Sequence, residues 1–185
     1  MNITMRRFSL FFTLVIVHSL ALCETLTGRV VSVTDGNTLV ILDAGNTRHK
    51  IRLRGIDAPE PGQAFGTKSR EHLADLVAGN PVVVEYSKYD PKEPVTGKVL
   101  FNDQDMNLQQ IEAGMAWHDM QHEGGQAAAD LIAYSDAERE ARRVGRGLWQ
   151  EANPVAPWDY RQAKREQKKA MESFEIRSET RDKPY

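Results

Sequence analysis

The chain is almost without cysteine, since Cys23 is the only one among 185 residues. A chain with a single cysteine cannot close an internal disulfide, so disulfide-stabilised scaffolds are excluded, as are zinc modules built from several cysteines. Cys23 also ends the N-terminal apolar segment. We expect that segment to be removed, which leaves the mature chain without any thiol and excludes a cysteine nucleophile.

Several signature motifs of common enzyme classes are absent as well. The sequence contains no P-loop, no glycine fingerprint for dinucleotides, no H-E-x-x-H zinc motif and no G-x-S-x-G nucleophile elbow. Nor does it contain an internal repeat. The chemistry must therefore come from another arrangement of polar residues on a single non-repetitive domain.

An excess of positive charge is lacking too. The chain carries 24 Lys and Arg against 26 Asp and Glu, a net charge of −2. Removing residues 1–23, with two arginines and no acidic residue, brings the net charge to −4. Nucleic-acid binders are often basic overall, so any recognition of phosphate must come from local placement of Arg52, Arg54 and nearby lysines.

The N-terminus has the pattern of a secretory signal. Arg6 and Arg7 precede a largely apolar run, Phe8–Leu22, and small residues precede the expected cleavage point. An uncleaved membrane anchor is one alternative, but the run is short and is broken by polar residues. A lipoprotein with a lipid on Cys23 is another, but the bulky Leu22 precedes the cysteine where a small residue is expected. We therefore predict a signal peptide over residues 1–23, a secreted or periplasmic location, and no stable membrane span after cleavage.

A meander of three strands begins the predicted domain. Val30–Val33 and Thr38–Leu42 are β-branched runs that flank Asp35-Gly36, a strong hairpin signal. A second turn leads into Thr47–Arg54, in which apolar and polar residues alternate as on a strand with one exposed face. Short turns thus join three consecutive antiparallel strands.

The remaining segments predict two more strands and about three helices. The expected strands are Pro81–Tyr86 and Gly97–Asn102, and the expected helices are Gln63–Val77, Leu108–Ala113 capped by Asn107, and Gln126–Val144. We predict a mainly β, α+β fold: a five-stranded Greek-key barrel of the OB type over residues 24–161. Residues 162–185 form a charged tail, helical at first and disordered from Glu175.

Three tryptophans outside the strands have predicted structural roles. Trp117 and Trp149 lie in apolar surroundings and are expected in the core. Trp158, which follows Pro157, is expected to hold the C-terminal segment against the domain.

The segment Ile51–Glu60, IRLRGIDAPE, contains the candidate site. Its strand ends at Gly55, and Pro59 prevents it from continuing, so Asp57 and Glu60 lie at the strand end or in the following loop. Both carboxylates are then within reach of Arg52. Two carboxylates beside an arginine suit a hard cation, a phosphate and a general base. A surface salt bridge beside a turn is the alternative.

Motifs in a fixed order resemble the staphylococcal nuclease (thermonuclease-like) family over roughly Thr25–Arg161. They are T-D-G-N-T at 34–38, IRLRGIDAPE, F-G at 65–66, E-A-G-M-A-W at 112–117 and G-L-W-Q at 147–150. The resemblance implies an OB-fold nuclease that cuts DNA or RNA with the help of Ca²⁺.

The same resemblance assigns roles to individual residues. It implies that Asp57, Asn37 and the Ala58 carbonyl hold the metal, that Glu60 is the general base and that Arg52 binds the reacting phosphate. Arg54, Lys92 and Lys98 are the candidate substrate-binding residues.

Two positions depart from the family pattern. Asn37 replaces a metal-binding aspartate, and Pro94 occupies the place of a second catalytic arginine, with no arginine between Arg70 and Arg139. We therefore expect weak Ca²⁺ binding and reduced activity. Two functions remain open: a weakened nuclease acting on single-stranded DNA or RNA, or a catalytically impaired OB-fold module that binds nucleic acid or a protein partner. We expect a monomer in either case.

Overall fold

The computed structural model describes residues 24–88, 90, 92–120 and 125–181. The predicted signal peptide, residues 1–23, lies outside the described residues. Among the described residues, no helix is both long enough and apolar enough to cross a bilayer.

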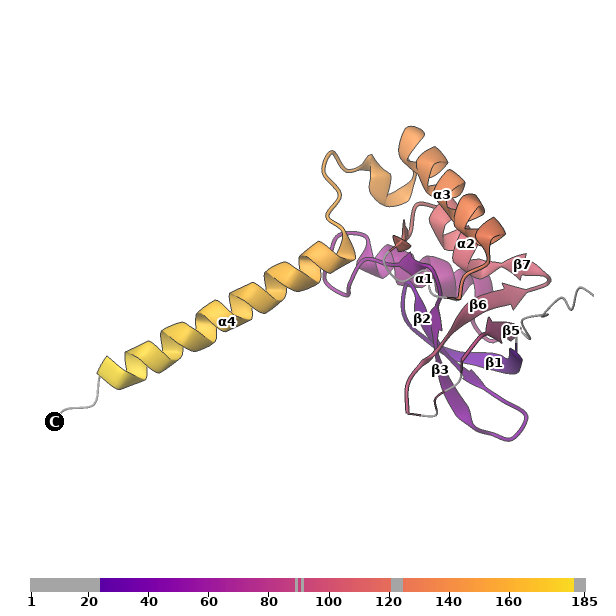
Figure 1. The fold of residues 1–185 in the computed structure, drawn as a ribbon, viewed down its shortest axis with the longest axis horizontal. Coiled ribbons are helices and arrows are strands. Elements are labelled where there is room, and N and C mark those ends of the chain that lie inside the picture. Colours follow the sequence, from indigo (N-terminus) through magenta and orange to yellow (C-terminus); the bar gives the residue numbers. More distant parts are fainter. Residues whose placement is uncertain (1–23, 89, 91, 121–124, 182–185) are drawn as a thin grey trace, which may run out of the picture.

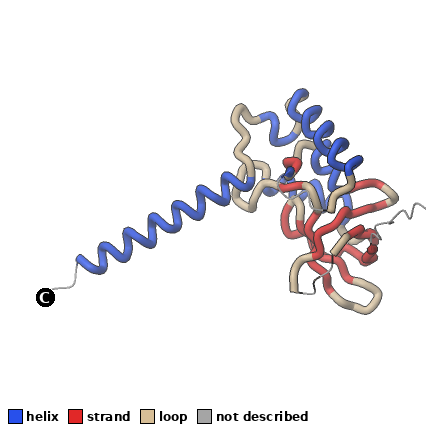
Figure 2. Tube along the Cα trace, viewed as in Figure 1, coloured by secondary structure: helices blue, strands red, loops and turns tan. Residues whose placement is uncertain are grey.

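Five strands close into a barrel, as predicted. The hydrogen-bonded order is β3-β2-β1-β5-β6, and a parallel pairing between β3 and β6 closes the sheet, with Ile51 opposite Val95 and Arg52 opposite Thr96. All the other barrel pairings are antiparallel. The strands are β1 (Glu24–Asp35), β2 (Thr38–Leu42), β3 (Arg48–Leu53), β5 (Pro81–Tyr86) and β6 (Val95–Phe101). Figure 2 shows these strands gathered in one body beside the helices.

The alternation that predicted the strands also fills the barrel. Ile51 and Leu53 on β3 are buried, while Arg52 between them is exposed. Strand β1 starts at Glu24, six residues before the predicted start at Val30, because Glu24–Arg29 pairs along β5. Most of that early segment is exposed, so its sequence carries little of the apolar signal that marks a half-buried strand.

Three further strands of two residues each lie in the described segments between the longer elements. They are β4 (Ile56–Asp57), β7 (Gln104–Asp105) and β8 (Trp117–His118). Strand β7 pairs antiparallel with the end of β6, and β4 pairs with β8 so that Asp57 lies opposite Trp117. The β4–β8 pair connects the candidate site to the helical part of the domain.

Within the described residues, four helices and the 3-10 turn η2 complete the fold (Figure 1). They are α1 (Gly66–Val77), α2 (Met106–Glu112), α3 (Ala128–Arg143), η2 (Gly147–Gln150) and α4 (Pro157–Arg181). Helix α4 passes without a break through residues 161 and 162, where the predicted domain ended, and continues to Arg181 although disorder was predicted from Glu175. Figure 1 shows it leaving the barrel as a long projecting rod.

The first turn of α4 is nevertheless attached to the domain. Ala156 is buried with Trp117 and Leu148, and Trp158 packs against this cluster, its ring centroid 6.4 Å from that of Trp117. Gln63 adds a polar contact, since its Nε2 donates to the Val155 carbonyl at 2.6 Å. The predicted role of Trp158 is confirmed.

Asn107 does not cap α2, contrary to the prediction. Asp105 is the N-cap, and its carboxylate accepts from the backbone N–H groups of Asn107 and Leu108. The Asn107 side chain instead points into the protein, where Nδ2 donates to the Arg54 carbonyl at 2.9 Å and Oδ1 accepts from the Val99 N–H at 3.1 Å. Asparagine is common at N-caps, but Asp105, two residues earlier, is the N-cap of this helix.

Candidate active site

The turn between β1 and β2 forms one wall of the site. A Cβ on Gly36 would collide with the Ser69 hydroxyl of α1, so only glycine allows this close approach. The buried Gln110 amide donates to the Gly36 carbonyl and to the Ser69 carbonyl, which ties the turn to α1. This packing places Asn37, only 6% exposed, at the edge of the pocket.

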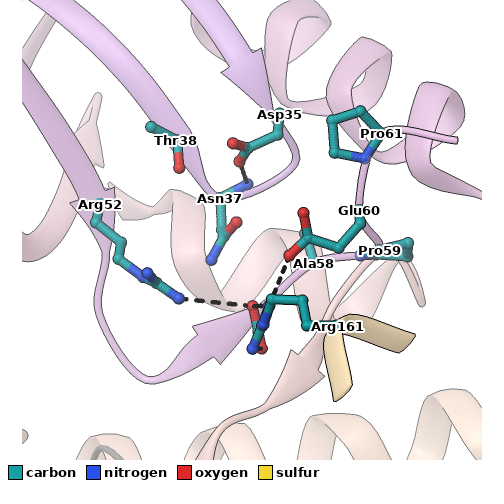
Figure 3. A pocket seen from close by; sticks show the side chains of 10 residues that line it. Asp35, Asn37, Thr38, Arg52, Ala58, Pro59, Glu60, Pro61 and Arg161 are labelled. Carbon is teal, nitrogen blue, oxygen red and sulfur yellow. Dashed lines mark hydrogen bonds and ion pairs between the residues drawn. The ribbon is translucent and has the colours of Figure 1, made fainter. Parts of the chain in front are cut away.

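Asn37 is oriented by two hydrogen bonds. Its N–H donates to Asp35 Oδ1 at 3.0 Å, and its Nδ2 donates to the Ile56 carbonyl at 3.2 Å. With Nδ2 directed at Ile56, the amide oxygen faces the open centre of the pocket (Figure 3). Asn37 therefore presents a neutral oxygen where a carboxylate would carry a charge.

Arg52 and Asp57 come together as predicted. Arg52 Nη2 lies 3.7 Å from Asp57 Oδ1, and the arginine side chain is 49% exposed while the aspartate side chain is 3% exposed. The arginine comes from the exposed face of β3 and the aspartate from β4, after the chain has turned at Gly55. The guanidinium thus reaches the buried carboxylate from the solvent side.

Glu60 lies in the loop between β4 and α1. Its N–H donates to Gln63 Oε1 at 3.0 Å, and its carbonyl accepts from the Gln63 N–H. A Cβ on Gly66 would collide with the Glu60 carbonyl, so the glycine lets α1 begin directly against the loop. The F-G motif therefore has a steric reason, and the Glu60 side chain remains partly open to solvent.

A second arginine completes the site, and it comes from α4. Arg161 donates from Nη2 to Asp57 Oδ2 at 2.6 Å, and from Nη1 to Asp57 Oδ1 at 3.2 Å and Glu60 Oε1 at 2.7 Å. Its guanidinium is thus bidentate to Asp57 and bridges the two carboxylates, and a dashed line in Figure 3 marks its contact with Glu60. Asp57 is flanked by one guanidinium from β3 and another from α4.

These residues share one cavity of about 290 Å³. Its walls are formed by Asp35, Asn37, Thr38, Arg52, Asp57, Ala58, Pro59, Glu60, Pro61 and Arg161. Of the eight candidate residues predicted from the sequence, the structure brings five into this cavity: Asn37, Arg52, Asp57, Ala58 and Glu60.

Burial and charge act in opposite directions on Asp57. Burial raises the pKa of the Asp57 carboxyl, and the neighbouring Asp119 raises it further, while Arg161 and then Arg52 lower it. The hydrogen bonds to Asp57 and Glu60 raise the pKa of Arg161, whose guanidinium therefore stays charged. The two arginines offset much of the cost of burying a carboxylate beside a second acid.

The donor set suits a hard cation. Asp57 offers a carboxylate, Asn37 an amide oxygen and Ala58 a carbonyl, and Asp35 and Glu60 add carboxylates on the same wall. Calcium prefers six to eight oxygen ligands of these kinds. Arg161 donates to both Asp57 oxygens and to Glu60, so a calcium ion at these carboxylates would compete with the guanidinium. The residue types that line the cavity nevertheless fit Ca²⁺.

The three candidate substrate-binding residues lie elsewhere. Arg54 donates to the carbonyls of Gly125 and Thr96 and to the Ser87 hydroxyl. Lys98 pairs with Asp130 at 2.6 Å.

The loop before β6 also lies outside the cavity. Lys92 and Pro94 line a separate hollow on the side of β3 that carries Arg48 and Lys50. The described residues of this loop therefore contribute no cationic side chain to the cavity that holds Arg52.

Comparison with known proteins identifies the family. The staphylococcal nuclease homologue family matches residues 50–151. The chain belongs to the staphylococcal nuclease family. It is 38% identical over 158 residues to an uncharacterized endonuclease of Haemophilus influenzae, covering 84% of this chain and 85% of the relative. It is 39% identical over 145 residues to an uncharacterized endonuclease of Escherichia coli, covering 77% of this chain and 90% of that protein.

A further relative carries a more specific name. The chain is 36% identical over 145 residues to the micrococcal nuclease of Shigella flexneri, covering 74% of this chain and 80% of the relative. The expected family and the OB-type barrel are thus confirmed. The matched region of the staphylococcal nuclease family ends at residue 151, before α4 begins at Pro157.

Arg161 was not among the site residues predicted from the sequence. It lies more than one hundred residues after Asp57 and Glu60, among many charged residues of α4. The available signal was Trp158, whose predicted attachment to the domain places the next turn of α4 beside the site. A helix repeats its direction after about 3.6 residues, so Arg161, three residues later, lies on the same side as Trp158.

Proposed function

We propose that this protein is a secreted or periplasmic, Ca²⁺-assisted nuclease that hydrolyses phosphodiester bonds in single-stranded DNA or RNA. One observation carries the proposal: a single cavity in a nuclease-family barrel holds Arg52, Asp57 and Glu60 together. The alternative, a binding module that has lost its chemistry, gives no reason for this trio to remain assembled.

Glu60 is the general base of the proposed reaction. Its carboxylate is partly exposed at the cavity wall, held by Gln63 through the backbone of its loop. A carboxylate so placed accepts a proton from the attacking water, whose oxygen bonds to phosphorus while the bond from phosphorus to the leaving oxygen breaks and that oxygen takes up a proton from solvent. Arg52 binds the non-bridging oxygens of the phosphate, where charge develops in the transition state.

Asp57, Asn37 and the Ala58 carbonyl would hold the calcium ion. A bound Ca²⁺ supplies charge neutralisation at a phosphodiester that is already anionic. Because Asn37 contributes a neutral oxygen in place of a carboxylate, affinity for the ion is lower than with an aspartate there. We propose that this loss of charge limits activity at low calcium concentration.

The test is cleavage of single-stranded DNA and RNA oligonucleotides by residues 24–185, with calcium and with a chelator. Glu60→Gln keeps the size of the side chain and removes the base, so we expect activity to fall by about 100-fold to 10,000-fold. Glu151→Gln is the matched control, because Glu151 is exposed outside the cavity, and it should cleave as the wild type does.

Other results would contradict a specific part of the proposed function. Equal activity of Glu60→Gln and wild type would overturn Glu60 as the base. If the wild type binds an oligonucleotide but cleaves neither substrate at any calcium concentration, the protein is a binding module. Fractionation of cells that express the full chain tests the location: retention of residues 1–23 on a cytoplasmic product would contradict secretion.

A further inference from the structure

We propose that Arg161 is a catalytic residue: it supplies the second guanidinium that contacts the reacting phosphate, from α4 and not from the loop before β6. The inference rests on the proposed nuclease function. It assigns an active-site role to a helix that lies beyond the family match, which ends at residue 151.

The Arg161 guanidinium lies in the same cavity as Arg52. Arg161 and Arg52 both contact Asp57, at 2.6 Å and 3.7 Å, so the two cations flank one carboxylate in the same cavity. A guanidinium carries five N–H donors, and the three hydrogen bonds to Asp57 and Glu60 leave donors for a ligand. A third of the Arg161 side chain is exposed, so these donors can be reached from solvent.

The start of α4, which carries Arg161, is held against the domain. Pro157 is buried at the start of α4, Trp158 packs on the Trp117 cluster, and Gln63 bonds both the Glu60 N–H and the Val155 carbonyl. The side chain that orients the loop of Glu60 thus also holds the segment leading into α4. Such preorganisation lets a charged donor act without the cost of ordering it during the reaction.

Arg161 also opposes the negative charge of the cavity wall. Asp35, Asp57 and Glu60 place three carboxylates on the cavity wall, and without Arg161 only Arg52 would oppose them there. A phosphodiester is an anion and is repelled by such a wall. With Pro94 directed to a different hollow, Arg161 is the described residue that corrects this imbalance.

Three full-length variants test the inference. Arg161→Ala removes the guanidinium, Arg161→Lys keeps a charge without the planar fork, and Arg165→Ala is the control from the next turn of α4, where Arg165 is exposed and outside the cavity. We expect Arg161→Ala to lower kcat on single-stranded DNA by about 100-fold to 1,000-fold. Arg161→Lys should recover only part of this loss, and Arg165→Ala should match the wild type.

Two readouts separate a chemical role from a structural one. Millimolar guanidinium chloride should raise the activity of Arg161→Ala but not that of the wild type, because the free ion can occupy the vacated space. Titration calorimetry should show that Arg161→Ala binds Ca²⁺ at least as tightly as the wild type, since a competing cation has been removed from Asp57 and Glu60. A loss of activity with no rescue by guanidinium would reduce Arg161 to a structural role and overturn the inference.

If Arg161→Ala is as active as the wild type or more active, the inference is also overturned. An increase, together with tighter calcium binding, would mean that Arg161 blocks the carboxylates as an inhibitory contact. With each of these results for Arg161→Ala, cleavage by the wild type still supports the proposed nuclease function, and only the inference about Arg161 is overturned. A wild-type protein that cleaves nothing overturns the proposed function and this inference with it.

Discussion

Replacing Asn107 by alanine should strongly destabilise the domain, although the residue lies outside the active-site cavity. Asn107 is fully buried. Its amide makes three hydrogen bonds to the backbone: Nδ2 donates to the carbonyls of Arg54 and Gly97, and Oδ1 accepts from the Val99 N–H. These contacts join α2 to β6 and to the end of β3, next to the turn that leads to Asp57.

The size of the destabilisation depends on which polar groups lose their hydrogen-bond partners. The Gly97 carbonyl keeps a donor, because it also accepts from the Arg54 N–H at 2.8 Å. The Val99 N–H and the Arg54 carbonyl lose the side chain that satisfies them. A buried polar group left unsatisfied costs about 1–3 kcal/mol, so two of them cost about 2–6 kcal/mol. Water entering the vacated space would reduce this, and we expect a loss of about 3 kcal/mol.

The assay is urea unfolding of residues 24–185, monitored by circular dichroism and by tryptophan fluorescence. For a domain of this size, a loss of about 3 kcal/mol corresponds to a melting temperature about 6–12 °C lower. Asn153→Ala is the matched control, since Asn153 is exposed and surface substitutions usually change stability by less than about 0.5 kcal/mol. A change below about 1 kcal/mol for Asn107→Ala would refute the reasoning that these buried groups depend on its amide.

Two other variants test the electrostatics of the site and of the core. Asn37→Asp should tighten Ca²⁺ binding by on the order of tenfold, measured by calorimetry, because it adds a carboxylate to the donor set; no change would place the ion elsewhere. Burial raises the pKa of the Asp105 carboxyl. The hydrogen bond that the Tyr134 hydroxyl donates to this carboxyl at 2.8 Å lowers the same pKa, and the net shift is upward. The folded state therefore binds the proton more tightly than the unfolded state, and stability falls as pH rises from about 3.9 through the raised pKa. Tyr134→Phe should make this fall larger in unfolding measurements between pH 3 and pH 7, and an equal pH dependence would contradict the role of Tyr134.

Local patterns were enough to predict the five-stranded barrel and the proximity of Arg52, Asp57 and Glu60. The alternation at Ile51–Arg54 predicted an exposed Arg52 on a half-buried strand, and the proline at 59 predicted that Asp57 and Glu60 lie just beyond it. These features depend on residues a few positions apart, where strand periodicity and turn chemistry decide the direction of each side chain.

Long-range pairings could not be predicted in the same way. Lys98 was a candidate for contact with substrate, but α3 brings Asp130 within 2.6 Å of its Nζ. Asn107 had the residue type of a helix cap, yet its amide satisfies the backbone of β3 and β6. Each side chain had several chemically reasonable partners, and the packing of helices on the barrel selected among them.

Strand periodicity, turn residues and ordered motifs were sufficient to predict a five-stranded barrel of the staphylococcal nuclease family, with Asp57 and Glu60 just beyond the strand that carries Arg52. The contact of Arg161 with Asp57 and Glu60 could be seen only in the folded protein, because it depends on how Trp158 and Gln63 hold the first turn of α4 against the domain. Strand periodicity is a local property of the chain, whereas the meeting of two charges about one hundred residues apart is decided by which surfaces can be buried together.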